Sequence, residues 1–162
     1  MTAQNCAFDV TATYPTTSNP PAPLGTVTTD QLGRNYQLVK GGGTVAQYGY
    51  VFITSDGLFT ASALTTTLVA AGKVAQIGCA QVALTSSLYG WVFRGGGAHT
   101  GSFLLSCVLG APVHPTATAG FVDDTSTTAR IDGLFVLATV GGADTTAAAW
   151  ASSQFMFTVG TA

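Results

Sequence analysis

The 162-residue sequence predicts an all-β protein, and three observations lead to this prediction. Short runs rich in β-branched and aromatic residues recur, glycine-rich turns separate them, and helical periodicity is scarce. The length suits one domain with a sizeable core. Many short strands with such turns are typical of a sandwich or barrel. We therefore expect a single β-sandwich or barrel, jelly-roll-like, over residues 25–162, preceded by an extended arm over residues 1–24.

The first 24 residues differ in composition from the remainder. Four of the six prolines, Pro15, Pro20, Pro21 and Pro23, lie here. Proline fixes φ and lacks an N–H donor, so this segment cannot run as a continuous helix or central strand. We expect at most a short strand within residues 7–14. The segment is either a loose tail or an arm that docks on a neighbouring molecule.

From residue 25 onward, strand and turn signals follow one another. Tyr36 and Leu38 alternate with polar neighbours, and the turn signal Ser55-Asp56-Gly57 ends the next apolar run. Residues 61–72 are ambiguous, because Ala and Leu favour a helix whereas three consecutive threonines oppose it. The expected strands are residues 25–29, 34–40, 47–53, 73–84, 89–94, 102–109, 120–124, 130–139 and 154–159.

Some of these segments carry finer expectations. Residues 73–84 and 89–94 form the clearest hairpin, with the first strand bent or bulged at Gly78. Residues 95–101 are expected to be a flexible glycine-rich loop. Residues 130–139 are almost wholly apolar, which predicts a central strand covered on both faces. No internal repeat of about 20–50 residues is convincing.

The low charge is the most informative feature of the composition. Charged residues make up 7% of the chain, none is glutamate, and the formal net charge is −2. Typical soluble domains carry about 25% charged residues. Few charges give little protection against self-association, and interface cores are depleted of charge in the same way. The composition suggests a protein that works in contact with other proteins, although a soluble threonine-rich domain would share it.

Several partners and settings are not expected. The basic residues Arg34, Lys40, Lys73, Arg94 and Arg130 are scattered singly, whereas nucleic-acid binding needs them clustered. Apolar runs fall short of the about 20 residues of a membrane-spanning helix, and the first residues carry no secretory signal. An odd number of widely spaced cysteines argues against a disulfide framework. We expect Cys6, Cys79 and Cys107 to be reduced and buried, as in a protein assembled in a bacterial cytoplasm.

No constellation of residues predicts catalysis, cofactor binding or metal binding. Asp123 and Asp124 are adjacent, so on a strand they would face opposite sides; in a turn they would accept bonds from backbone N–H groups. His99, Cys107 and His114 are metal-ligand types, but their spacing matches no zinc pattern. A nucleophile elbow and a phosphate loop are also lacking. The predicted lists of catalytic, cofactor and metal residues are therefore empty, and we expect no enzyme.

Three ordered tracts resemble a known family. They are Gly25-Thr26-Val27 with Asp30, Gly33, Tyr36 and Val39-Lys40; Ile77-Gly78-Cys79-Ala80-Gln81-Val82-Ala83 with Tyr89-Gly90-Trp91-Val92 and Gly95; and Thr116-Ala117-Thr118-Ala119-Gly120 with Asp123-Asp124 and Ile131-Asp132-Gly133. In this order they resemble capsid decoration (cement) proteins of tailed bacteriophages. The resemblance covers roughly residues 25–139 and leaves the N-terminal segment outside.

The resemblance implies a virion structural protein without catalytic residues. It implies a β-rich domain on the outer surface of the head, with the major capsid protein and further copies of itself, as a homodimer or homotrimer, as partners. The alternative is a tail, neck or fibre component of the virion that binds a receptor or glycan. That alternative predicts an exposed aromatic platform at Tyr89 and Trp91. Trp91 and Trp150 are otherwise expected in a core or an interface.

Overall fold

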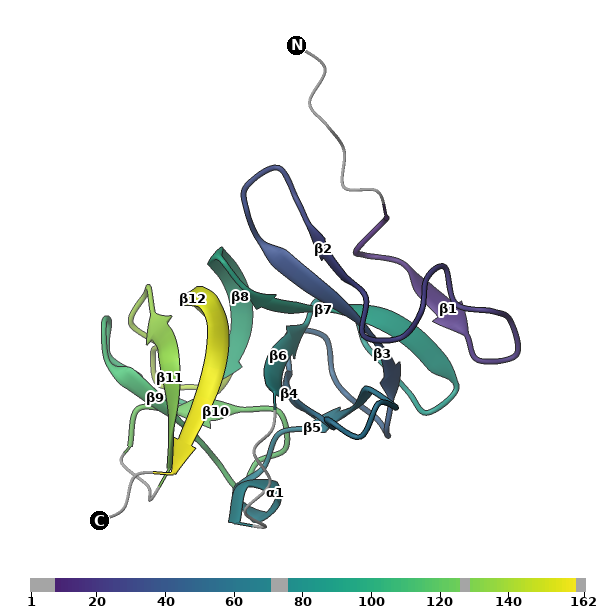
Figure 1. The fold of residues 1–162 in the computed structure, drawn as a ribbon. Helices are drawn as coiled ribbons and strands as arrows, with labels where there is room; N and C mark the ends of the chain where they lie inside the picture. Colours follow the sequence, from purple (N-terminus) through teal and green to yellow (C-terminus); the bar gives the residue numbers. More distant parts are fainter. Residues whose placement is uncertain (1–7, 71–75, 126–128, 160–162) are drawn as a thin grey trace.

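The computed structural model describes residues 8–70, 76–125 and 129–159 (Figure 1). Within these ranges the prediction of an all-β protein is confirmed, because the only helix is the single turn and a half of α1 (Thr66–Ala70). No helix in the described part of the chain has the length and hydropathy needed to span a membrane. The strands fall into two sheets.

The first sheet contains seven strands in the order β1-β7-β6-β4-β5-β3-β2. An additional pairing of β7 with β3 closes five of them into a ring, which we call the first barrel. Strands β1 and β2 extend the sheet outside this ring. The bounds are β1 Thr13–Pro15, β2 Val27–Thr29, β3 Asn35–Gly41, β4 Tyr50–Ile53, β5 Thr60–Ala63, β6 Gln76–Ala80 and β7 Leu88–Gly95.

The second sheet is a closed barrel of five strands in the order β10-β8-β12-β11-β9, and Figure 1 shows it beside the first. We call it the second barrel. The bounds are β8 Gly97–Phe103, β9 Pro112–Pro115, β10 Val122–Asp123, β11 Ala129–Val136 and β12 Thr145–Val159. The finer prediction of one jelly-roll-like sandwich is therefore not confirmed, since the strands divide between two small barrels.

The two barrels share one topology. In each, the first strand pairs antiparallel with the fifth, the fifth with the fourth, the fourth with the second, and the second with the third. A parallel pairing of the third strand with the first then closes the ring. Strands β3 to β7 and β8 to β12 are thus two copies of one arrangement. This repeat was not predicted from the sequence, because each unit is longer than the about 20–50 residues of common sequence repeats.

The barrels meet around the ring of Tyr50, which starts β4. Tyr50 is fully buried, and its hydroxyl lies 3.2 Å from His99 Nε2 of β8. Phe93 of β7 stacks on the same histidine with ring centroids 4.3 Å apart, and Phe103 meets Tyr50 edge-on. A Cβ atom at Gly101 would collide with the Tyr50 hydroxyl. The glycine therefore leaves the space that lets the two barrels pack closely.

This contact explains one failed prediction. Residues 95–101 were expected to be a loose glycine-rich loop, but residues 97–101 belong to β8 and pair with β12. Gly101 admits the Tyr50 hydroxyl, whereas Gly96 and Gly97 lie against Gly33 and Arg34, so these glycines allow close packing. At Gly78 the expected bulge is absent, because β4 and β6 pair without a register shift. A Cβ there would lie 2.9 Å from the Phe93 carbonyl oxygen, so close packing is again the reason for glycine.

Other strand predictions are confirmed or corrected. The predicted hairpin is confirmed as the antiparallel pair β6–β7. Of the ambiguous residues 61–72, the first three end β5 and residues 66–70 form α1, and residues 71 and 72 lie outside the described part of the chain. The strand expected over residues 102–109 ends at Phe103, and the predicted central strand at 130–139 is covered on one face only. Its outward side chains Phe135 and Leu137 are exposed.

The N-terminal segment packs on its own chain over its described residues 8–24. Phe8 stacks on the buried Trp91 with ring centroids 5.1 Å apart, and β1 pairs with β7. Val10, Tyr14 and Leu24 also pack against the core cluster. The prediction of an extended arm is therefore not confirmed for this part of the segment. Cys6 lies outside the described residues, whereas Cys79 and Cys107 are buried free thiols as expected.

We predict that Phe8→Ala destabilises the chain by about 1–2 kcal/mol. This is less than the about 3–5 kcal/mol of a fully buried phenylalanine, because Phe8 is only partly buried. Urea unfolding followed by circular dichroism measures the change. Leu32→Ala is the control, since Leu32 is exposed and its loss should leave stability nearly unchanged. Equal stability of both variants would show that the segment does not stabilise the first barrel.

Candidate interaction surface

An exposed row of apolar side chains crosses the outside of the second barrel. Trp150 of β12 pairs with Ala98 of β8 and with Phe135 of β11, and Phe135 pairs with Pro112 of β9. All four residues are exposed, Trp150 at 48% and Phe135 at 44%. Paired residues on one face of a sheet lie in contact distance. We call Ala98, Trp150, Phe135 and Pro112 the apolar row.

The surroundings of the apolar row add further apolar surface. Leu137, two residues after Phe135, is also exposed. Arg130 and Asp132, on the same strand, form an ion pair of 2.5 Å, so their charges cancel locally. Along a strand of a barrel, side chains point alternately to the interior and to the exterior, and those that face water are normally polar. This part of the exterior does not follow that pattern.

A neighbouring loop carries three further exposed apolar side chains. Leu105, Val108 and Leu109 lie between β8 and β9. The loop is tied to the end of β11, because Gly110 N–H donates to the Val136 carbonyl and Val140 N–H donates to the Cys107 carbonyl. Most of the exposed large apolar side chains in the described part of the chain thus lie on the second barrel and its loops.

Asp123 and Asp124 accept bonds from backbone N–H groups as expected, although Asp123 lies in β10 and not in a turn. Asp124 Oδ2 accepts from Val108 N–H at 2.8 Å, and Asp123 Oδ1 accepts from Asp124 N–H at 2.8 Å. The structure also brings Cys107 to this pair, with ligand-type atoms all within 4.8 Å of one another. Sequence spacing gave no signal of this meeting, because the loop and β10 are joined only by tertiary packing.

The chemistry of this group favours structure over catalysis. Burial, together with the two nearby carboxylates, raises the pKa of the Cys107 thiol to about 12. A protonated thiol is a poor nucleophile. It is placed instead to donate to the Leu104 carbonyl and to Asp123. The three side chains hold the loop that carries Leu105, Val108 and Leu109.

The structure does not bring His99, Cys107 and His114 together. His99 lies between the two barrels, and His114 Nδ1 bonds the Ala129 carbonyl on β11. Burial, followed by the charge of Arg34, lowers the pKa of His99 to about 3. His99 is therefore neutral at physiological pH and stabilises the junction as a packed, uncharged ring.

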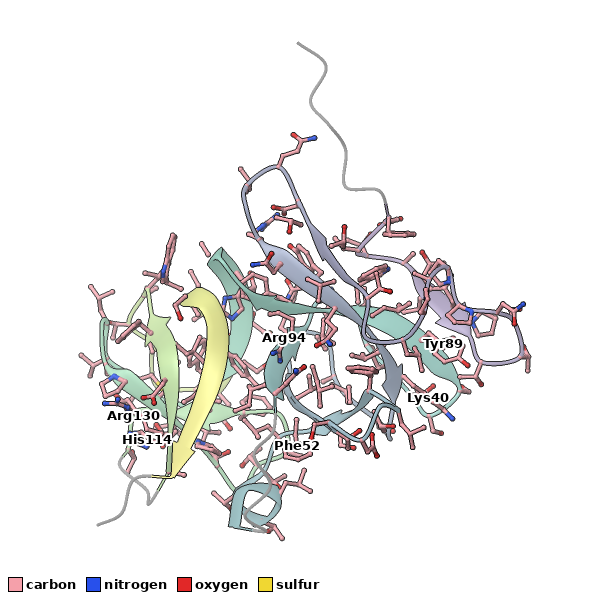
Figure 2. The ribbon with its side chains drawn as sticks, viewed as in Figure 1. Lys40, Phe52, Tyr89, Arg94, His114 and Arg130 are labelled. Carbon is pink, nitrogen blue, oxygen red and sulfur yellow. The ribbon has the colours of Figure 1, made fainter. Side chains whose placement is uncertain are left out.

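The basic residues stay apart in space. Figure 2 shows Lys40, Arg94 and Arg130 in different parts of the molecule. Arg94 is buried, and its guanidinium donates to the Ile77 carbonyl. Arg34 pairs with Asp30 at 2.7 Å. Lys73 lies outside the described residues. The described basic side chains therefore form no continuous stripe of the kind that phosphate backbones require.

The exposed aromatic platform predicted at Tyr89 and Trp91 is wrong. Trp91 is fully buried, and Tyr89 packs partly buried against the same core. The exposed tryptophan is Trp150, which sequence analysis had placed in a core or an interface. Its alanine-rich surroundings on β12 do not reveal which face is covered, so the apolar row was not predicted.

We predict that the chain loses stability as the pH falls from about 6.5 towards 3. The pKa of His99 is about 3 when folded and 6.5 ordinarily, so in this window the unfolded chain binds a proton that the folded chain does not. The contribution of His99 to stability then falls with decreasing pH by at most about 1.4 kcal/mol per unit. Above pH about 6.5 this contribution is constant.

Urea unfolding at a series of pH values measures this dependence. His99→Gln is the matched variant, because an amide keeps a polar partner for Tyr50 but does not titrate. Its stability should vary less with pH, since both proteins share the same aspartates and His114. Parallel profiles for the two proteins would contradict the assignment to His99.

The chain matches no known protein-family model, and comparison with curated proteins and with solved structures also gives no match. Its function is therefore inferred from its own residues and surfaces.

Proposed function

We propose that this chain is a capsid decoration protein of a tailed bacteriophage, which binds the outside of the assembled head and stabilises it without catalysis. The observation that carries the proposal is the uncharged apolar row on the exterior of the second barrel. A protein with 7% charged residues and such a face is suited to permanent contact with other proteins. The ordered sequence tracts that resemble decoration proteins supply the particular setting.

The contacts of the side chains that could carry chemistry support a structural role. Asp123, Asp124 and Cys107 hold a loop, and His99 packs between the barrels. Each of these side chains has partners that serve the fold. Stabilisation of a head would then follow from binding alone, because a ligand that binds only the assembled shell favours it by RT ln(1 + [L]/Kd). Many copies on the outer surface, assembled in the bacterial cytoplasm, would together oppose the pressure of packed DNA.

The alternative, a tail, neck or fibre component that binds a receptor or glycan, has less support. Its predicted platform required an exposed Trp91, and Trp91 is buried beneath Phe8. The apolar row lacks the hydrogen-bonding side chains that orient a sugar on an aromatic ring. The head position is therefore the function we favour.

The copy number in purified virions tests the position. Quantitative mass spectrometry should give this chain at a ratio near one, or a simple fraction such as one half, to the major capsid protein. A lattice of equivalent sites is the reason for such a ratio. A ratio of a few per cent would instead place the chain in the tail or neck and overturn the proposal.

We also predict that binding to heads depends only weakly on salt. The contact rests on apolar side chains, whereas charge-steered interfaces weaken strongly as ionic strength rises. Co-sedimentation of the purified chain with stripped heads, at about 0.05 M and about 0.5 M NaCl, should change the apparent Kd by less than about threefold. Release of the chain by the higher salt concentration would contradict an apolar contact.

A further inference from the structure

A short stretch of the N-terminal segment lies over Trp91 of the first barrel. We call residues 8–11, which precede β1, the strap. Phe8 stacks on the Trp91 ring with centroids 5.1 Å apart and an interplanar angle of 29°. Val10 packs against the same core cluster, whereas Asp9 and Thr11 are exposed. The strap therefore turns two apolar side chains towards the core and covers a tryptophan that is otherwise fully buried.

The hydrogen bonds of the strap stay within its own turn. Asp9 Oδ1 accepts from the backbone N–H of Thr11 at 2.9 Å and from the Thr11 hydroxyl at 2.7 Å. The Asp9 carbonyl accepts from Ala12 N–H at 3.2 Å. Pairing with the barrel begins at Thr13, whose register partner is Gly90. Within the described ranges, no hydrogen bond links residues 8–11 to the barrel, so lifting the strap breaks none.

The indole N–H of Trp91 gains from an opening of the strap. Its Nε1 atom is buried and has no hydrogen-bond partner in the described part of the chain. A buried donor without an acceptor is unfavourable, because it has lost its hydrogen bond to water. Water that reaches the indole restores this bond. The closed strap thus keeps a donor unsatisfied that the open strap would satisfy.

Only apolar contact holds the strap closed, whereas the chain after it is anchored. Phe8 and Val10 are each only partly buried, so opening exposes less apolar surface than the loss of a core side chain would. After the strap, β1 pairs with β7, and Thr16 N–H donates to the Ser87 carbonyl at 2.8 Å. The chain can therefore pivot at residue 12 while β1 stays in the sheet.

We propose that the strap is a lid that opens about residue 12 and uncovers Trp91 while both barrels stay folded. The closed lid hides an aromatic ring, and the open lid presents that ring together with a free N–H donor. The open state is a minor one, of the order of 1% of molecules, because Phe8 and Val10 favour the closed state. The proposal goes beyond the proposed function, since it concerns a face of the first barrel and not the apolar row.

Hydrogen exchange of the Trp91 indole N–H measures the opening. The full-length chain has two tryptophans, so the variant Trp150→Phe leaves a single indole signal in an NMR spectrum of the ¹⁵N-labelled protein. Because the Trp91 N–H makes no hydrogen bond within the described structure, its exchange requires only that water reach it. The backbone amide of Val92, in the middle of β7, serves as the internal reference.

We expect the indole N–H to be much less protected than the Val92 amide. After correction for intrinsic exchange rates, the indole N–H should exchange at least about 100-fold faster, because a local opening needs less free energy than unfolding. Its rate should stay constant up to about 1 M urea, since the opening exposes little surface. Exchange of the Val92 amide should instead accelerate with urea, because β7 opens only when the barrel unfolds.

A second substitution tests whether Phe8 holds the lid closed. In the Trp150→Phe background, Phe8→Ala should raise indole exchange about 5- to 30-fold, because the lost ring contact shifts the equilibrium towards the open state. Leu32→Ala is the matched control; Leu32 is 74% exposed, and its replacement should leave indole exchange unchanged. Circular dichroism should show that all variants keep the fold.

Two outcomes would overturn the proposal. One is indole exchange that accelerates with urea in parallel with the Val92 amide, because Trp91 would then be uncovered only by unfolding of the barrel. The other is urea-independent exchange that Phe8→Ala leaves unchanged, because water would then reach the indole by a route that does not involve the strap.

Discussion

The packing of Tyr50 between the two barrels is the interaction on which the rest of the structure depends. Its ring is fully buried, its hydroxyl meets His99, and Gly101 leaves the room that it needs. Tyr50 meets Phe103 of the second barrel edge-on, and outward side chains of the first barrel join one buried cluster with the interior of the second barrel. The interior of the first barrel forms a separate valine-rich cluster.

Because of this arrangement, two barrels of the same topology differ in how much of their outward surface is buried. The outward row of the first barrel lies under the second and carries tyrosine, phenylalanine and cysteine at full burial. The equivalent row of the second barrel carries Trp150 and Phe135 and meets no other part of the described chain that buries it. In a chain so poor in charge, an apolar face of this kind is better explained by a partner than by solubility. The proposed role in a phage head starts from this asymmetry.

The ionisable groups show the same emphasis on structure. His99 is neutral because burial disfavours its charge, and the Cys107 thiol is protonated because burial and two carboxylates disfavour the thiolate. Asp124 holds the Val108 backbone, and Arg94 holds the Ile77 carbonyl. Strands and loops hold these groups in place, and the groups in turn stabilise the packing of those strands and loops. These side chains therefore stabilise the fold.

The sequence by itself determined the all-β character, most strand positions, the backbone-bonding role of Asp123 and Asp124, and the burial of Cys79 and Cys107. These features follow from local alternation, turn chemistry and residue type. Only the tertiary structure decided that the strands divide into two barrels, that residues 97–101 form a strand, and that Phe135 and Trp150 are exposed while Trp91 is buried. Periodicity shows which residues share a face, but the partner that covers the face depends on pairings between residues distant in sequence.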